Sequence, residues 1–362
     1  MPVKPLNWQR RSDAFTARFG LTHPLLMAPM AGACPPALAA AVAAGGGMGA
    51  AGALLLDAAG IAKWTAEFRA LGGGPLQLNL WIPDPAPVRD LAAEAAMRSF
   101  LAGFGPAVPE DAFENAPLAD FDAQCHALLE AEPSAISSIM GLFPPAVAAA
   151  ARAAGIAWFA TATTVDEAVA AERAGADVIV AQGAEAGGHR GCFDAGRAHE
   201  SASGLFALLP AIVDAVSVPV VATGGIADAR GIAAALMLGA SAVQIGTGLL
   251  RCPEAAIHPA WADALATVRP DQTRLTRAFS GRLGRALATD FVAAAATPDA
   301  PPPTPYPIQR ALTGPMRAQA QRDGDLQRMQ AWAGQSARLA VAEPAARLVE
   351  RVWNEALALL AS

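Results

Sequence analysis

Charged residues are scarce in this chain of 362 residues: they make up 16% of it, and no long block of Lys or Arg occurs. The formal net charge is −6, and the sequence pI is near 5.4. Because nucleic-acid partners usually require a basic face, this balance argues against that class of ligand. Long apolar runs are also missing, since Gly, Pro or charge interrupts each one, and the first residues hold no signal core. We therefore expect a soluble cytoplasmic protein with no membrane partner.

Cysteine is rare and scattered. The chain has Cys34, Cys125, Cys192 and Cys252, and no two of them have C-x-x-C spacing. Neither an H-x-x-x-H pair nor a carboxylate cluster of the metal-ligand type occurs, so we predict no metal site. Cys192 lies three residues after His189, which leaves a Cys–His nucleophile pair open, although nothing else in the sequence marks a hydrolase.

Apolar residues are abundant, at 54% of the chain, which is enough for a large core. Eight short apolar segments recur along the chain, and most are followed by a helical pattern. The predicted strands cover residues 25–30, 48–53, 76–82, 135–140, 156–160, 178–181, 218–222 and 242–245. The predicted helices between them cover residues 37–44, 58–71, 144–154, 165–174, 205–215 and 229–238. Eight strand–helix units predict an α/β protein, a (β/α)8 barrel of the TIM type.

Two stretches fall outside this repeat. Residues 83–133 form a long, Pro-bearing insertion with helical patterns over 90–101 and 121–131. The tail has a stiff Pro-rich connector at 300–305 and helical patterns over 319–338 and 344–360. We therefore divide the chain into a barrel, residues 1–265, and a C-terminal helical covering segment, residues 266–362, placed over the barrel mouth.

A histidine follows the sixth predicted strand. His189 stands beside Gly187-Gly188, shortly after the apolar run 178–181. Barrels of this type carry their chemistry at the carboxyl ends of the strands, and an imidazole is the side chain most easily tuned to accept a proton at neutral pH. We take His189 as the candidate catalytic base; a surface loop with an inert histidine is the plainer interpretation.

Glycines end the last two predicted strands, as Gly224-Gly225 and as Gly246 before Thr247. Residues without side chains let backbone N–H groups approach an anion, and a threonine hydroxyl adds a donor. Each glycine alone could mark a tight turn. Since loops after strands seven and eight form the usual phosphate cradle of such barrels, together they favour a phosphate-bearing ligand.

The phosphate-bearing ligand can be narrowed. Neither a Walker A motif nor a strand-linked G-x-G-x-x-G is present, which leaves flavin mononucleotide (FMN) or pyridoxal phosphate. Pyridoxal phosphate requires a Schiff-base lysine, and Lys4 and Lys63, the lysines of this chain, lie at no strand end. Asn79 and Gln182 stand at two other strand ends and could form hydrogen bonds with a flavin ring or ribityl chain, or else act as capping residues.

Several segments together resemble bacterial class I nitronate monooxygenases, formerly called 2-nitropropane dioxygenases. The resemblance runs from about Phe19 to the C-terminus, and its most specific part is the run Gln182 to Arg190. It rests on Ala28-Pro29-Met30, Asn79-Leu80, Ala181-Gln182-Gly183-Ala184-Glu185-Ala186-Gly187-Gly188-His189-Arg190-Gly191, Gly224-Gly225-Ile226, Gln244-Ile245-Gly246-Thr247, Ser280-Gly281-Arg282 and Trp332-Ala333-Gly334-Gln335.

The resemblance implies an FMN enzyme that oxidises alkyl nitronates with O2, giving a carbonyl compound and nitrite, with nitroalkanes as weaker substrates. His189 matches the catalytic base, and Tyr306 matches a tyrosine near the substrate pocket. Ser280 and Arg282 lie in a basic stretch that either folds back to an anion or forms a solvated turn. The implied cofactor-binding residues are Pro29, Met30, Asn79, Gln182, Gly187, Gly188, Gly224, Gly225, Gln244, Ile245, Gly246 and Thr247.

The chain departs from the family pattern at two positions. Ile139 stands where some members have a second histidine, and Gly314 where they have a lysine. These departures predict a less polar and less cationic pocket. Two other functions remain open: an NAD(P)H-dependent flavin reductase acting on enoyl thioesters or quinones, and a catalytically silent flavin-binding scaffold. A homodimer is one assembly that we consider.

Overall fold

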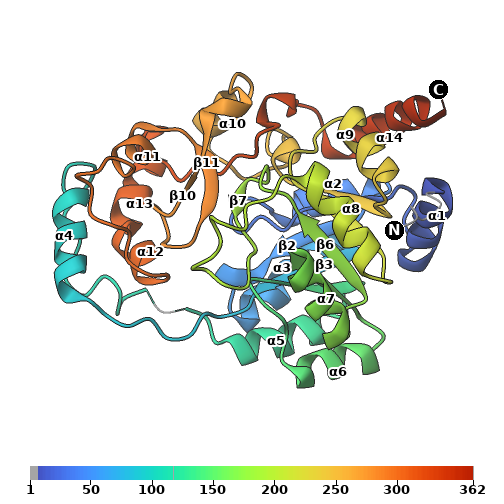
Figure 1. The fold of residues 1–362 in the computed structure, drawn as a ribbon, viewed down its shortest axis with the longest axis horizontal. Coiled ribbons are helices and arrows are strands. Elements are labelled where there is room, and N and C mark those ends of the chain that lie inside the picture. The colour runs from blue at the N-terminus through green and yellow to red at the C-terminus, as the bar shows by residue number, and fades with distance from the viewer. Residues whose placement is uncertain (1–6, 117, 362) are drawn as a thin grey trace.

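Eight parallel strands form the centre of the structure, a computed structural model that describes residues 7–116 and 118–361 (Figure 1). Their order is β1-β9-β8-β6-β5-β4-β3-β2, and a parallel bridge between Leu26 and Met48 joins the two ends into a nearly closed barrel. The strands are β1 (Leu25–Met27), β2 (Gly49–Gly52), β3 (Leu76–Trp81), β4 (Ala135–Ile139), β5 (Ala157–Ala162), β6 (Val178–Gln182), β8 (Val220–Thr223) and β9 (Ala242–Ile245). The predicted (β/α)8 barrel is confirmed.

Continuous apolar strands give the barrel two cores. Along each strand, alternate side chains point to opposite sides. One set, which includes Leu26, Val180 and Val221, fills the interior, and the other set packs outward against the helices. Helix α1 (Trp8–Phe19) lies at the amino end of the strands and adds Phe15 and Phe19 to the interior cluster. The amino end is therefore closed by packing, which leaves the carboxyl ends of the strands for a ligand.

Helices surround the barrel; six of them occur where the sequence predicts barrel helices, and α5 and α14 come from the insertion and the tail. They are α2 (Pro36–Ala44), α3 (Ala58–Ala70), α5 (Phe121–Glu130), α6 (Pro145–Ala153), α7 (Val165–Ala174), α8 (Leu205–Ala215), α9 (Ala229–Met237) and α14 (Ala345–Ala361). Asp57, Thr164 and Asp228 begin α3, α7 and α9 as N-caps, because their side-chain oxygens accept from backbone N–H groups of the first turn. Short 3-10 turns follow two strands, η1 (Ala53–Leu55) and η2 (Thr247–Leu249). None of the helices in the described ranges is long and apolar enough to cross a bilayer.

The last helix of the chain packs on the barrel. Helix α14 contacts α2 and α9, and its apolar face, which includes Leu348 and Val352, joins the outer core. It therefore takes the place of the helix that follows β9. We propose that the barrel comprises α14 as well, so that residues 246–344 form a covering segment inserted before it.

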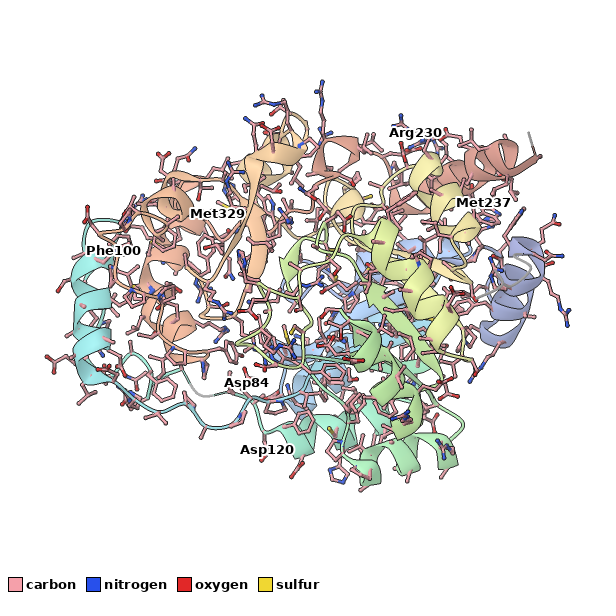
Figure 2. The ribbon with its side chains drawn as sticks, in the orientation of Figure 1. Asp84, Phe100, Asp120, Arg230, Met237 and Met329 are labelled. Atoms are coloured by element: carbon pink, nitrogen blue, oxygen red, sulfur yellow. The ribbon has the colours of Figure 1, made fainter. Side chains whose placement is uncertain are left out.

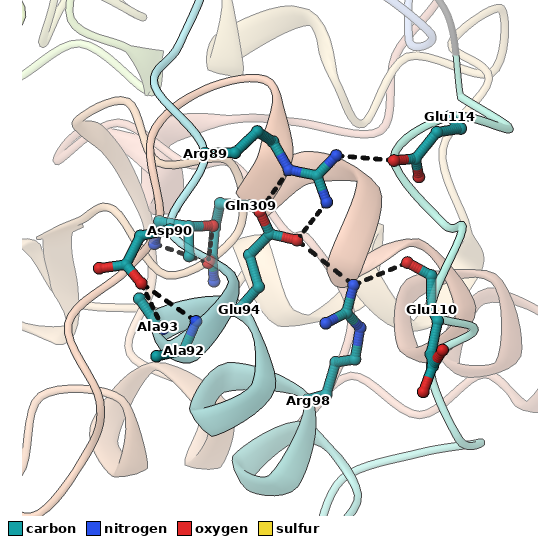
Figure 3. Close-up of polar contacts among 10 residues, drawn as sticks. Arg89, Asp90, Ala92, Ala93, Glu94, Arg98, Glu110, Glu114 and Gln309 are labelled. Carbon is teal, nitrogen blue, oxygen red and sulfur yellow. Dashed lines mark hydrogen bonds and ion pairs between the residues drawn. The ribbon is translucent and has the colours of Figure 1, made fainter.

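The covering segment and the first part of the insertion form one body beside the barrel mouth (Figure 1). Helix α4 (Leu91–Leu101) of the insertion shares a hydrophobic cluster with α11 (Asp290–Ala294), α12 (Ile308–Leu312) and α13 (Gly314–Asp323). Glu94 of α4 is fully buried and accepts hydrogen bonds from the guanidinium groups of Arg89 and Arg98 (Figure 3). These contacts join neighbouring parts of the insertion to one another. Helix α5 instead packs on the barrel helix α3. The part of the insertion that lies away from the barrel therefore ends near residue 120. The remaining elements of the segment are α10 (Pro259–Leu265), η3 (Pro270–Gln272) and η4 (Ala337–Leu339).

The predicted helix over 319–338 is wrong. Helix α13 ends at Asp323, because Gly324 adopts a left-handed conformation with φ of 67° and caps it. The chain then runs without a long helix to residue 336, and Trp332 forms an antiparallel bridge with Ala286. The predicted helix over 344–360 is confirmed as α14.

A second, antiparallel sheet was not predicted. It has the order β10-β11-β7 and consists of β10 (Thr273–Thr276), β11 (Gly284–Leu287) and the two-residue strand β7 (Gly188–His189). His189 pairs with Gly284 and Gly188 with Arg285. The covering segment is therefore hydrogen-bonded to the loop that carries the candidate base.

Candidate active site

A cavity of about 260 Å³ lies at the carboxyl ends of the barrel strands, under the covering segment. Most of the sequence-predicted site residues line it together. They are Pro29, Met30, Asn79, Gln182, Gly187, Gly188, His189, Gly224, Gly225, Gln244, Gly246, Thr247, Ser280 and Tyr306. Lys63 is on the outer helix α3 with a highly exposed side chain beside Glu67, and Lys4 lies outside the described residues.

Two predicted residues do not line the cavity. The side chain of Ile245 belongs to the outer hydrophobic core, because alternate residues of a strand face opposite sides and Gln244 faces the cavity. Arg282 is 3% exposed at its side chain and forms an ion pair with Asp84. Its guanidinium also donates to the backbone oxygen of Cys192 at 3.0 Å and lies 5.7 Å from the ring centre of Trp81. Both side chains therefore lie outside the cavity lining, and a contact of either residue with a cofactor or substrate stays a prediction.

His189 is held by several independent contacts. The amide of Gln182 donates from Nε2 to His189 O at 3.2 Å, and its Oε1 accepts from Gly191 N at 2.7 Å. Ring centres of Trp81 and Trp332 each lie 4.8 Å from the imidazole. On its polar side, Nε2 lies 2.7 Å from Ser280 Oγ. Because the Gln182 side chain fixes the loop in this way, we assign it a positioning role, and its contact with a cofactor stays a prediction.

The loop that carries His189 is fixed by buried charge as well. Arg190 donates to the backbone oxygens of Gln182, Thr163 and Ser201 at 2.8 to 3.2 Å. Cys192 donates its thiol to Asp194 O, and burial raises the pKa of that thiol. Since a nucleophilic cysteine requires a lowered pKa, and since His189 pairs with Ser280 rather than with a thiol, the structure argues against a Cys–His nucleophile pair.

The electrostatic field of the cavity is positive. Burial, followed by the charges of Arg282, Arg310 and Arg317, lowers the pKa of His189 to about 3, so its imidazole is neutral at physiological pH. Arg310 and Arg317 line the cavity themselves. The guanidinium of Arg317 donates to Thr313 Oγ1, Gln330 Oε1 and Arg310 O, all neutral acceptors, and burial lowers its pKa to about 10. The cavity is therefore cationic without a lysine at position 314, and a pocket less cationic than that of family members with this lysine stays a prediction.

Two stacked aromatic residues with unpaired donors also line the cavity. The rings of Trp81 and Tyr306 stack with centres 4.6 Å apart. Within the described part of the chain, Trp81 Nε1 and Tyr306 Oη are buried without a hydrogen-bond partner. Buried donors without partners are costly, and a ligand with oxygen acceptors would satisfy them.

Sequence reasoning assigned no role to several other residues that line the cavity. Trp81 and Met140 lie at the ends of β3 and β4, and the covering segment adds Arg310, Arg317, Gln330, Trp332, Gly334 and Ser336. Trp81 ends a predicted strand and Trp332 lies in a family motif, so both carried a signal. Arg310 and Arg317 carried none, because their place depends on how two helices of the tail pack. Met140 has a φ of 71°, which is rare for a side chain of its size and marks the end of β4 as a constrained position.

Another part of the cavity lining offers groups that fit a flavin phosphate. Gly224 and Gly225 have φ values of 111° and 71°, so this turn exposes backbone without side chains. Thr247 Oγ1 accepts from Gly334 N at 3.0 Å, which leaves its own proton to donate to an anion. Gln244 Oε1 is buried without a partner in the described residues and is suited to accept from a flavin N–H or hydroxyl. A Cβ at Gly187 would lie 2.5 Å from Gly334 N, so this close approach requires glycine.

Comparison with known proteins identifies the class. The family model described as nitronate monooxygenase matches residues 12–355. The chain belongs to the nitronate monooxygenase family. A nitronate monooxygenase of Paraburkholderia phytofirmans is 41% identical over 353 residues, and the match covers 96% of each chain. The nitroalkane oxidase structure from Streptomyces ansochromogenes has a TM-score of 0.84 at 38% identity and covers 96% of this chain and 99% of that one.

A solved structure of another kind is similar to a lesser degree. FabK from Thermotoga maritima has a TM-score of 0.74 at 26% identity, with 96% of this chain and 97% of that chain covered. Members of the nitronate monooxygenase family are flavoenzymes, and this chain is accordingly an oxidoreductase that acts on nitronates or nitroalkanes. Its resemblance to the family, inferred from the motifs, is confirmed.

Proposed function

We propose that the chain uses FMN to oxidise alkyl nitronates with O2 to a carbonyl compound and nitrite, and that it acts more weakly on nitroalkanes. The observation that carries this proposal is a neutral imidazole, His189, in a cavity whose charged side chains are arginines. A bound flavin would act as the electron acceptor, and O2 would reoxidise it. The residues Gly224, Gly246 and Thr247 would hold its phosphate.

His189 would act as the base for neutral nitroalkanes. A carbon acid loses its proton only if a base is within reach and the anion that forms is stabilised. The imidazole supplies the first condition, since its lowered pKa keeps it unprotonated. Arg310 and Arg317 supply the second, because their charges favour the anionic nitronate over the neutral nitroalkane. A nitronate arrives deprotonated and requires only binding.

His189→Asn tests this assignment. We expect the variant to keep its flavin and to lose kcat/KM on nitroethane by about 10² or more, the usual contribution of a general base. The loss on ethyl nitronate should be much smaller, because no proton has to be removed. Steady-state oxygen consumption with both substrates measures the two ratios. Equal losses on the two substrates would show that His189 does not act as the base.

The alternative is an NAD(P)H-dependent flavin reductase, which the similarity to FabK in fold keeps open. The flavin spectrum of the purified protein distinguishes the two functions when propionate 3-nitronate and NADH or NADPH are added separately without oxygen. Bleaching by the nitronate alone supports the proposed function. Bleaching by the nicotinamide alone would assign the chain to the reductases. Turnover with either substrate excludes a silent scaffold.

A further inference from the structure

Ser280 is buried and makes three polar contacts around one hydroxyl. Its Oγ lies 2.7 Å from His189 Nε2 and 3.2 Å from Arg282 O, and it accepts from Arg282 N at 3.3 Å. A serine hydroxyl has a single proton. It can donate that proton to Arg282 O or to His189 Nε2, but not to both. The choice decides which nitrogen of the imidazole carries hydrogen.

The carbonyl of Arg282 favours the first arrangement. Arg282 is a buried residue, and Ser280 is the donor that the described part of the chain offers to its backbone oxygen. If the hydroxyl turned toward Nε2, this carbonyl would lose its partner away from water, which costs stability. With the hydroxyl on Arg282 O, every contact is satisfied only if Nε2–H donates to Ser280 Oγ.

The charges of the cavity favour the same arrangement. Among the described residues, Nδ1 of His189 has no hydrogen-bond partner, yet it is not a buried atom. Because the ring lines the cavity, Nδ1 faces that cavity. Arg310 and Arg317 line that cavity. A lone pair on Nδ1 is attracted to their positive charges, whereas an N–H would point its positive end at them.

We propose that Ser280 is a positioning residue that holds His189 as the Nε2–H tautomer, so that Nδ1 is the atom that accepts the substrate proton. The role of Nδ1 as a base rests on the proposed function; the tautomer does not. In the step, the C–H bond next to the nitro group breaks and its proton bonds to Nδ1. The electron pair stays on the substrate, which becomes the nitronate, and Ser280 Oγ continues to accept from Nε2–H of the imidazolium.

The first test reads the tautomer directly. Nitrogen NMR of the flavin-bound protein, labelled at histidine, distinguishes a protonated from an unprotonated ring nitrogen, and His189→Asn assigns the signals. We expect Nε2 protonated and Nδ1 bare in the wild type, and a mixture of tautomers in Ser280→Ala. A wild type with hydrogen on Nδ1 would overturn the proposal, and so would a Ser280→Ala spectrum identical to that of the wild type.

The second test is kinetic. We expect Ser280→Ala to lose kcat/KM on nitroethane by about tenfold or more relative to its loss on ethyl nitronate, which is the scale of one hydrogen bond to a charged group. Ser280→Thr, which keeps the hydroxyl, should restore the ratio. A ratio unchanged in Ser280→Ala would contradict the positioning role. If the wild type oxidised neither substrate, the proposed function would fail while the NMR result still decided the tautomer; if Ser280→Ala did not fold, the wild-type spectrum alone would decide it.

Discussion

Asp84 is the residue whose removal tests most sharply how the covering segment supports the site. It stands where the insertion leaves the barrel (Figure 2), and its carboxylate pairs with the guanidinium of Arg282, with Nε at 2.8 Å from Oδ2. The side chain of Arg282 is 3% exposed and that of Asp84 is 23% exposed. Asp84→Asn would therefore leave an almost fully buried guanidinium with neutral partners only.

The size of the effect follows from this burial. Removing one partner of a buried ion pair costs about 3–5 kcal/mol, and we expect about 2–3 kcal/mol here because Asp84 is reached by water. With an unfolding entropy of about 2.1 cal/mol/K per residue, 362 residues give about 0.76 kcal/mol/K, so the melting temperature should fall by roughly 3–4 °C. The unpaired charge of Arg282 should also lower the pKa of His189 further, since that charge already lowers it.

Thermal and urea unfolding of the flavin-bound protein measure the loss. The matched control is Asp120→Asn, at the far end of the same insertion (Figure 2), where the side chain caps α5 and Asn caps about as well as Asp. The control should unfold within about 1 °C of the wild type. If Asp84→Asn were as stable as the control, the ion pair would contribute nothing, and the insertion would not be fastened to the site through Arg282.

Two further substitutions examine the ends of the cavity. Gly246→Leu should yield folded but colourless protein. A Cβ at Gly246 would lie 3.3 Å from Ala28 Cβ without a backbone clash, and the rest of the leucine side chain would fill the space proposed for the flavin. If the variant held as much flavin as the exposed control Gly103→Leu, the phosphate would bind elsewhere. Arg317→Gln should raise the KM for an anionic nitronate by about tenfold with less change in kcat, since it removes a half-buried charge from the cavity lining. Arg322→Gln, exposed on the same helix, should leave KM as it is, and equal KM values in both variants would refute a role of the charge in binding.

The barrel could be predicted because each of its strands is buried on both faces. Such strands are continuous apolar runs, and all eight occur within three residues of their predicted bounds. The side-chain phase of these strands could not be predicted for the same reason. Gln244 and Ile245 both lie in a buried strand, yet only Gln244 faces the cavity, and no alternation in polarity separates a barrel interior from its outer core.

The covering segment could be predicted only in part, because its structure depends on contacts distant in sequence. Residues 325–336 were predicted to continue a helix, but their backbone pairs with other segments: Ala333 N donates to Arg285 O, and Gln335 N to Glu185 O. The two-residue strand with His189 exists for the same reason. A local pattern of propensities does not contain such pairings, so the residues that this segment brings to the cavity, Trp332 among them, required the structure.

The field around His189 bears on which substrate the site favours. Burial, and after it the nearby arginines, disfavour an imidazolium and lower the pKa of His189 to about 3, whereas the arginines favour an anion in the same space. For a neutral nitroalkane these two effects oppose one another, because the proposed proton transfer to His189 would create an imidazolium and a nitronate together. For a nitronate only the favourable effect remains, since the substrate arrives as the anion and the imidazole stays neutral. The geometry therefore favours nitronates over nitroalkanes. The hydrogen bond from Nε2 to Ser280 should affect the reaction of neutral nitroalkanes most, because only these substrates require His189 to accept a proton.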